Sequence, residues 1–318
     1  GGSGDDLFYG GAGRDVFVGG AGTDIVSYED SDTGVLATLW RIGQNGTADG
    51  DTHYDVEGLR GSHFNDELGA NREDTILEGS SGDDTLNGND GNDHLYGGLK
   101  SGLDGDAAQA DKLFGGNGDD VIVSAANDLG TVAEGGQGSD TITVHNGSAF
   151  GDDGFDVLTG TGNSYLLSGG SGNDVLNLNL TGQSGTGGIA LGGMGDDTYI
   201  VNTTGLVSIQ DEGWDINDTL ILNSIANISQ LNVTRIGDDA YLHGANDGSA
   251  GVPDNGVKLA GWYAGFNNIE HLQTAEFLLG PGNGGAHLGG VARVGPDGKI
   301  VAAGVDFLGL TAHGVGGI

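Results

Sequence analysis

GGSGDDLFY, GGAGRDVFV and GGAGTDIVS follow one another without interruption as residues 1–9, 10–18 and 19–27. Each nine-residue repeat has glycine at positions one, two and four, aspartate at position six and an apolar residue at position eight. A period this short predicts stacked turns of backbone instead of a globular core. The glycines allow sharp turns with positive φ, and the aspartate places a carboxylate beside the turn carbonyls. This oxygen-rich, anionic arrangement suits Ca²⁺, which takes about six to eight oxygen ligands.

The repeat recurs further down the chain. Additional copies begin at Gly79, Gly88, Gly115, Gly135, Gly151, Gly169 and Gly192. The pattern resembles the nonapeptide G-G-x-G-x-D-x-U-x of the repeats-in-toxin (RTX) family, in which U is a large apolar residue. The resemblance covers most of residues 1–200. It implies an all-β fold, a right-handed parallel β-roll (a β-solenoid) that binds several Ca²⁺ ions.

The repeats supply the candidate metal ligands. The position-six carboxylates are Asp6, Asp15, Asp24, Asp84, Asp93, Asp111, Asp120, Asp140, Asp156, Asp174 and Asp197. The turn glycines whose carbonyls are expected beside them are Gly2, Gly4, Gly11, Gly13, Gly20, Gly22, Gly82, Gly91, Gly116, Gly118, Gly136, Gly138, Gly170 and Gly172. The alternative is ordinary turn chemistry, since aspartate and glycine both favour turns. That alternative applies most to Asp152 and Asp153, where the glycine pattern is degraded.

Two nonapeptides form one coil in this interpretation, so residues eighteen apart stack on one another. We therefore expect Asp6 to stack on Asp24 and Asp93 on Asp111, with a Ca²⁺ ion between the stacked turns. Asp15 faces the opposite edge and needs a partner further along the chain. Position eight points inward because side chains alternate along a strand. The expected inward ladder is Phe8, Phe17, Val26, Leu86, Leu95, Leu113, Ile122, Ile142, Leu158, Leu176 and Tyr199.

Composition divides the chain into five blocks. Residues 1–78 form a first β-roll block with an extension, residues 79–150 a second block with a loop insertion at 99–109, and residues 151–200 a third, looser block. Residues 201–278 resemble the haemolysin-type domain that closes such arrays, so a mainly β capping role is expected. Residues 279–318 form a glycine-rich tail with a hairpin turn at 294–299. The resemblance implies a type I secretion signal in this tail, and an assembly element is the alternative.

Two of these blocks allow finer expectations. In the extension we expect inward-facing Val56, Leu59, Phe64, Leu68 and Ile76, and Trp40 as a core or cap aromatic. In the capping block, strand patterns occur at residues 206–210, 218–222, 231–236, 240–244 and 256–263.

The charge of the chain narrows the classes of partner. There are 46 acidic and 10 basic residues, which gives a formal net charge of −36. Such self-repulsion opposes a compact chain without bound cations, so metal binding is expected to contribute much of the folding free energy. The acidity argues against nucleic acid and anionic membrane surfaces. There is no cysteine and no apolar run long enough to span a membrane, and because the chain starts inside a repeat we expect it to continue upstream.

No catalytic motif is recognisable in the sequence. Neither H-E-x-x-H nor G-x-S-x-G occurs, so we expect no enzymatic activity. The leading hypothesis is a calcium-binding region of a secreted or cell-surface bacterial protein, exported by a type I secretion system and folded outside the cell as a scaffold. One alternative is a Ca²⁺-dependent surface-layer, filament or adhesin protein that binds copies of itself. Another is a non-catalytic module of a polysaccharide-modifying exoenzyme, with cell-surface polysaccharide as its partner.

Overall fold

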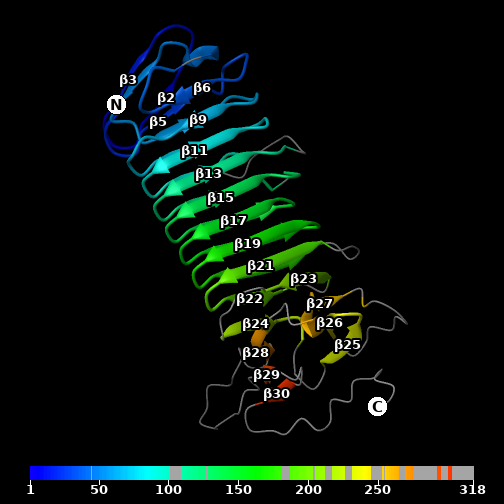
Figure 1. The fold of residues 1–318 in the computed structure, drawn as a ribbon. Coiled ribbons are helices and arrows are strands. Elements are labelled where there is room, and N and C mark those ends of the chain that lie inside the picture. The colour runs from blue at the N-terminus through cyan, green and yellow to red at the C-terminus, as the bar shows by residue number, and fades with distance from the viewer. Residues whose placement is uncertain are drawn as a thin grey trace, which may run out of the picture. The chain divides into compact units, whose positions relative to one another are not determined.

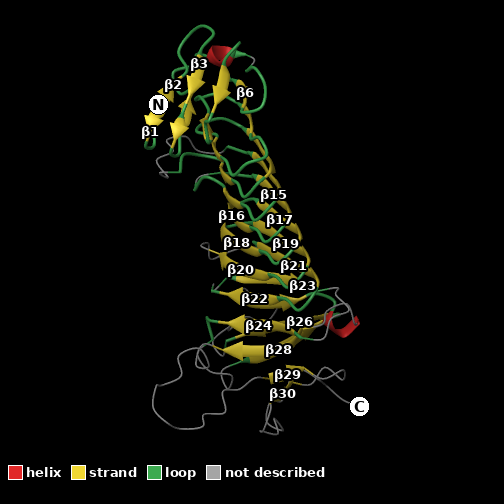
Figure 2. Cartoon of the chain, turned by 90° about the vertical axis from the view of Figure 1, so that its left-hand side faces the viewer, coloured by secondary structure: helices red, strands yellow, loops and turns green. Residues whose placement is uncertain are grey.

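The computed structural model describes residues 1–43, 45–100, 109–126, 128–180, 187–202, 205–211, 217–225, 231–244, 253, 255–264, 269–274, 292–294 and 300–302. Within this part, regular structure is almost entirely β, with short 3₁₀ turns at Gly46–Ala48 and Trp262–Ala264 (Figures 1 and 2). The chain divides into two compact units, Gly1–Asp156 and Val157–Ile318. No helix among the described residues is long and apolar enough to cross a membrane.

The first unit consists of short strands joined by glycine-rich turns. Its strands are β1 (Gly2–Ser3), β2 (Leu7–Tyr9), β3 (Val16–Val18), β4 (Gly20–Ala21), β5 (Ile25–Ser27), β6 (Leu36–Thr38), β7 (Thr52–Tyr54), β8 (Gly58–Arg60), β9 (Glu67–Gly69), β10 (Ile76–Glu78), β11 (Thr85–Asp90), β12 (His94–Tyr96), β13 (Lys112–Asn117), β14 (Val121–Val123), β15 (Val132–Gln137), β16 (Thr141–His145) and β17 (Ser148–Asp153). One parallel sheet has the order β2-β5-β8-β10-β12-β14-β16, and the second has the order β6-β9-β11-β13-β15-β17. Two further parallel pairs, β1 with β4 and β3 with β7, form separate two-stranded sheets. From β8 onward the chain alternates between the two large sheets, which is the topology of a parallel β-solenoid.

The core of the first unit is a pair of stacked apolar columns. In one sheet Leu77 pairs with Leu95, and Leu95 with Ile122, and all three side chains are fully buried. In the other sheet Leu86 pairs with Leu113 in the same way. Burying a side chain of this size stabilises the fold by roughly 1.5–3 kcal/mol. Since every strand contributes only one or two such residues, stability accumulates coil by coil.

The second unit begins with the same two-sheet arrangement and ends differently. Its strands are β18 (Val157–Gly162), β19 (Tyr165–Ser171), β20 (Val175–Leu180), β21 (Gly188–Met194), β22 (Thr198–Val201), β23 (Leu206–Gln210), β24 (Asp218–Leu222), β25 (Asn232–Ile236), β26 (Asp239–His243), β27 (Gly256–Leu259), β28 (Ile269–Thr274), β29 (Ala292–Val294) and β30 (Ile300–Ala302). Strands β18 to β24 pair in parallel, whereas β25-β26-β27 and β28-β29-β30 pair antiparallel. Parallel stacking continues as far as β27 on β23 and β28 on β24, and antiparallel strands are added to β27 and β28.

Several expectations about strands and core are confirmed. The fold is all-β and parallel, and strands occur at all five patterns predicted in residues 201–278. The hairpin expected around residues 294–299 has strands β29 and β30, and its turn lies outside the described residues, as do 101–108 of the insertion and most of the 279–318 tail. The position-eight residues are buried except Phe8, which is half-buried.

Two expectations about the extension, those for Phe64 and Ile76, are wrong. Phe64 is 46% exposed and does not face inward. Trp40 is 58% exposed and is not a core residue, so only its role as a cap aromatic stays a prediction. Ile76 is half-buried, and its neighbour Leu77 points inward instead. The sequence offers two adjacent apolar residues there, and a strand can bury only one of them on a given face.

Candidate metal centres

A ladder of buried aspartates lies along one edge of the first unit. Each of these aspartates directly precedes a strand. The backbone N–H of Asp93 donates to Oδ1 of Asp120 at 2.7 Å, and that of Asp120 donates to Oδ1 of Asp140 at 2.8 Å. Asp140 in turn donates to Oδ1 of Asp156 at 2.8 Å. All four side chains are buried. One oxygen of each carboxylate therefore ties its coil to the preceding coil.

The second oxygen of these carboxylates has no such role. Oδ2 of Asp93, Asp120 and Asp140 is buried and accepts no hydrogen bond. A Cβ added to Gly115 would collide with Oδ2 of Asp120 and with the carbonyl oxygen of Gly135 in the next coil. The bare glycine thus leaves a space in which two oxygens converge. Buried carboxylate oxygens without donors are costly unless a cation neutralises them.

More carbonyl oxygens line the space between successive turns. A Cβ on Gly136 would meet the carbonyl of Gly116, and a Cβ on Gly138 would meet the carbonyl of Gly118. Every turn glycine predicted as a carbonyl donor has positive φ, which turns its carbonyl along the stack. The donor set is all oxygen and includes carboxylates, which fits a hard cation such as Ca²⁺.

The pKa values of the ladder carboxylates also indicate that these groups need a cationic partner. Burial raises the pKa of Asp93 to about 7, and repulsion from Asp120 and Asp74 adds to the effect. Burial likewise raises the pKa of Asp140 to about 7 and that of Asp120 to about 6. These groups are poorly stabilised as anions by the protein alone. A bound divalent cation supplies the charge that favours the ionised form.

The opposite edge of the first unit carries a shorter ladder. The backbone N–H of Val35 donates to Asp66 at 2.7 Å, Asp66 to Asp84 at 2.8 Å and Asp84 to Asp111 at 2.9 Å, each to Oδ1. Asp111 then donates to the hydroxyl of Thr131, where the carboxylate series ends. Asp66 was missed from the sequence because its turn, GSHFND, keeps only the first glycine and the final aspartate of the repeat.

The predicted stacking register is confirmed in part. Asp6 lies against Asp24, with its N–H donating to Oδ1 at 2.9 Å across eighteen residues. The expected pair of Asp93 and Asp111 is wrong, because Asp93 pairs with Asp120 across 27 residues and Asp111 belongs to the other edge. The insertion lengthens one coil by nine residues, which shifts the register by a whole repeat.

The partner of Asp15 comes from a degenerate repeat. The N–H of Asp15 donates to Oδ1 of Asp51 at 2.8 Å, and Asp51 is fully buried. Asp51 ends the segment GTADGD, which keeps the first glycine of a repeat turn but has threonine and aspartate at positions two and four. Its Oδ2 accepts a hydrogen bond from the hydroxyl of Tyr28 at 3.2 Å, so this site is partly satisfied by protein donors.

The second unit continues the ladder on its own strands. The N–H of Asp174 donates to Oδ1 of Asp197 at 2.8 Å, and that of Asp197 donates to Oδ1 of Asp218 at 2.7 Å. Asp218 is fully buried and was not predicted, because it lies outside any clear nonapeptide. The doublet Asn217-Asp218 before a strand was the available signal.

The side chains at position five of the repeat form a second set of turn contacts, which the sequence did not predict. Oδ1 of Asp119 accepts the N–H of Ser139 at 2.7 Å, and Oδ1 of Asn92 accepts the N–H of Asp119 at 2.8 Å. These side chains are exposed, and each accepts a backbone N–H from the following coil. The position-six carboxylates instead accept an N–H from the preceding coil. The recurring G-D-D and G-N-D triplets carried this signal.

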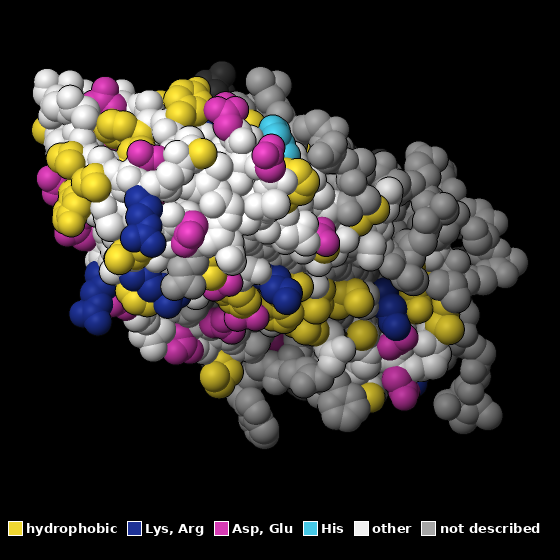
Figure 3. Space-filling model, turned by 90° about the horizontal axis from the view of Figure 1, so that it is seen from above, with side chains coloured by type: hydrophobic (Ala, Val, Ile, Leu, Met, Phe, Trp, Pro, Cys, Tyr) yellow, Lys and Arg dark blue, Asp and Glu magenta, His cyan; other side chains and the backbone are white. Residues whose placement is uncertain are grey.

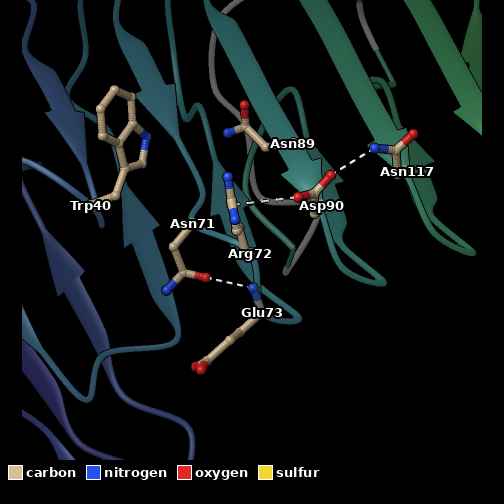
Figure 4. Close-up of a pocket in the computed structure, with 7 residues that line it drawn as sticks. All are labelled: Trp40, Asn71, Arg72, Glu73, Asn89, Asp90 and Asn117. Carbon is tan, nitrogen blue, oxygen red and sulfur yellow. Dashed lines mark hydrogen bonds and ion pairs between the residues drawn. The ribbon is translucent and has the colours of Figure 1, made fainter.

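A surface hollow of about 720 Å³ lies apart from the ladders in the first unit. It is lined by Trp40, Asn71, Arg72, Glu73, Asn89, Asp90 and Asn117 (Figure 4). Asp90 accepts a hydrogen bond from Nδ2 of Asn117 at 2.6 Å and pairs with Arg72 at 3.6 Å. Most of the polar groups that line this hollow therefore hydrogen-bond or form ion pairs with one another.

Comparison with known families agrees with the geometry. Four copies of the RTX calcium-binding nonapeptide repeat match residues 1–30, 70–99, 107–128 and 150–180. No curated protein matches the chain. The four matches contain the turns that hold Asp6, Asp24, Asp93, Asp120 and Asp174. The chain therefore carries RTX calcium-binding repeats, and its parallel β-solenoid is consistent with an RTX β-roll.

Proposed function

We propose that this chain is a non-catalytic scaffold that stays largely unfolded until it meets Ca²⁺ outside the cell. The observation that carries the proposal is the series of buried Oδ2 atoms at Asp93, Asp120 and Asp140, which accept no hydrogen bond. Without cations the folded state must hold these carboxylates away from water. Binding of Ca²⁺ removes that cost, so the ions contribute directly to folding.

The proposed ligands follow from the ladder. Position-six carboxylates of consecutive coils and the carbonyls of their turn glycines hold one ion between each pair of turns. Support comes from the convergence of Oδ2 of Asp120 with the carbonyl of Gly135, and from the all-oxygen donor set. Modules with such sites often bind Ca²⁺ at about 0.1–1 mM, which is available outside cells.

The location and the end blocks are part of the same proposal. The protein is exported by a type I system, with the signal in residues 279–318, and the antiparallel strands β25 and β26 help to close the last parallel coil. An open parallel coil would expose unpaired backbone N–H and C=O groups, and this supports the presence of a cap. The folded, acidic repeats then serve as a scaffold for whatever adjoins them.

Export and folding can be tested together. The full chain and a version lacking residues 279–318 are produced in a host with a type I exporter, in medium containing about 1 mM Ca²⁺. We expect the full chain in the medium, resistant to protease, and the shortened chain inside the cells. Equal amounts of both forms in the medium would refute the assigned signal.

Self-assembly remains a second candidate because the first strands leave apolar side chains exposed. Val16 is 66% exposed, Tyr54 58% and Val18 51%. Hydrophobic side chains also lie among acidic ones on the face seen in Figure 3. Contiguous apolar surface often marks a protein interface. Analytical ultracentrifugation in Ca²⁺ decides: a monomer supports the scaffold alone, and oligomers that a Val16→Ser and Tyr54→Ser double variant abolishes support assembly.

A further inference from the structure

The last turn of the aspartate ladder in the second unit is built differently from the others. After β22 and β23 the chain reaches Asp211, and β24 starts at Asp218. Asp197, Asp211 and Asp218 are each no more than 1% exposed. One ligand oxygen from each lies within 4.8 Å of the other two. Ligands on opposite sides of a Ca²⁺ ion are about twice 2.3–2.6 Å apart, so these three oxygens can share one ion.

Asp211 replaces a glycine of the repeat. Strands β21 and β23 pair Leu191 with Gln210, so the residues that follow, Gly192 and Asp211, occupy the same place in consecutive coils. At the preceding turns this place is position one, where only glycine fits beside the ladder carboxylate. The terminal turn is therefore the point where a third carboxylate joins the two that the ladder already supplies.

A tyrosine hydroxyl supplies a further oxygen at the same place. Tyr199 is fully buried, and its hydroxyl lies beside the backbone of Gly192 without a well-formed hydrogen bond. A Cβ on Gly192 would meet Oδ2 of Asp197 and this hydroxyl, whereas a Cβ on Gly115 meets Oδ2 of Asp120 and a carbonyl. The hydroxyl thus takes the position that a carbonyl of the next coil holds in an ordinary turn.

The carboxylates and the hydroxyl face one another. The charges of Asp211, Asp197 and Asp218 all act on the Tyr199 hydroxyl, which is buried with them. Among the described residues of this unit, Arg235 pairs with Asp238 and Lys258 with Asp239, outside the cluster. Three buried carboxylates whose oxygens converge beside a buried hydroxyl favour a cation that prefers oxygen ligands.

We propose that Asp197, Asp211, Asp218 and the Tyr199 hydroxyl form a terminal Ca²⁺ site that is chemically distinct from the repeat sites. It has three carboxylates and a phenol oxygen in place of glycine carbonyls. It fixes β22, β23 and β24 to one another where the nonapeptides stop. The absence of imidazole and thiolate ligands and the negative charge favour Ca²⁺ over transition metals.

Ion counting on the full chain tests this site. Wild-type protein, Asp211→Asn and the control Asp238→Asn are dialysed against about 0.1 mM free Ca²⁺, and bound calcium is measured by mass spectrometry. Asp238 is exposed at its ion pair in the same unit, so its variant makes the same change in charge away from the cluster. We expect Asp211→Asn to bind about one ion fewer per chain and Asp238→Asn to match the wild type. Equal ion counts in all three proteins would overturn the site while leaving the repeat sites and the proposed scaffold function untouched.

A direct measurement on the wild-type chain covers the case in which Asp211→Asn fails to fold. Crystals are grown with Tb³⁺ in place of Ca²⁺, and anomalous scattering locates the ions. A peak in contact with Asp197, Asp211, Asp218 and the Tyr199 hydroxyl supports the site. Peaks at the repeat turns with none at this cluster would overturn it, and no peaks anywhere would refute metal binding by the repeats as well.

Discussion

Adjacent aspartates in one turn have opposite roles. Asp119 is exposed and its Oδ1 accepts the N–H of Ser139 in the following coil. Asp120 is buried, and its Oδ1 accepts the N–H of Asp93 in the preceding coil. Only the buried residue keeps a second carboxylate oxygen out of water and without a donor. The same side chain is therefore a surface cap at one position and a candidate ligand at the next.

Substituting the two neighbours separates these roles. Asparagine keeps Oδ1, so both Asp119→Asn and Asp120→Asn retain the backbone cap and lose one charge. We expect Asp120→Asn to weaken Ca²⁺ binding at the adjoining sites about tenfold or more, which corresponds to about 1.4 kcal/mol. Asp119→Asn should change it less than about threefold, through screened charge alone. Calorimetric titration measures both, and equal effects would contradict the assignment of Asp120 as a ligand.

Position two of the repeat shows the cost of departing from glycine. Ser80, Asn89 and Asp152 occupy it with φ of 82°, 69° and 71°. Side chains other than glycine are disfavoured there by roughly 1–2 kcal/mol. The neighbouring coils hold these residues in the glycine conformation, so the stack overrides local preference.

Restoring the glycine should therefore stabilise the protein. Asp152 is exposed, so Asp152→Gly relieves the strain and loses little contact. We expect its free energy of unfolding in Ca²⁺ to rise by about 1 kcal/mol in urea titrations. Asp153→Gly removes the same charge from a residue without positive φ and serves as the control. If both variants gain equally, the effect comes from charge and the backbone argument fails.

The elements show what the sequence could and could not predict. Period nine and the inward position eight led to the correct alternation of short strands, because each repeat carries its own turn and core residue. Register across the insertion was not predictable, since the extra residues before Asp111 add a full repeat to one coil. The sequence did not predict three ladder aspartates: Asp51, Asp66 and Asp218. Each lies in a turn that has lost most of the repeat glycines, and its partner is an aspartate of another coil that is distant in the sequence.

The ladder also predicts a response of the metal-free chain to acid. The pKa of Asp93 and Asp140 is raised from 3.8 to about 7 in the fold, so the folded state binds protons that the unfolded state releases. These groups favour folding below pH 4, and that contribution is lost as the pH rises through 7. Without metal, β content by circular dichroism should increase from pH 8 to pH 5. A steady loss of β content over that range would contradict buried, unpaired carboxylates.

Calcium binding should depend on pH in the opposite sense. Protons and Ca²⁺ compete for the same carboxylates, so the apparent affinity should fall as the pH drops from 8 to 5. Titration at three pH values measures the change. An affinity independent of pH would mean that the ions bind at the exposed position-five carboxylates and not at the ladder.

For the molecule as a whole, the net negative charge opposes folding until cations bind. The chain carries a formal charge of −36, and its buried ladder adds carboxylates that are withdrawn from water. The apolar columns contribute one or two residues per strand, which is a thin core for a chain of 318 residues. Bound ions that neutralise the turns also join consecutive coils, and this is why we regard Ca²⁺ as a structural component.

The most direct measurement is therefore the far-ultraviolet circular dichroism of the full chain in chelator and then in about 1 mM Ca²⁺, with Mg²⁺ at the same concentration as the control for charge screening. We predict a disordered spectrum in chelator and in Mg²⁺, and a β spectrum with a cooperative thermal transition in Ca²⁺. A β spectrum in chelator with the same thermal midpoint as in Ca²⁺ would contradict the account, because the repeats would then fold without the ions that their turns are built to hold.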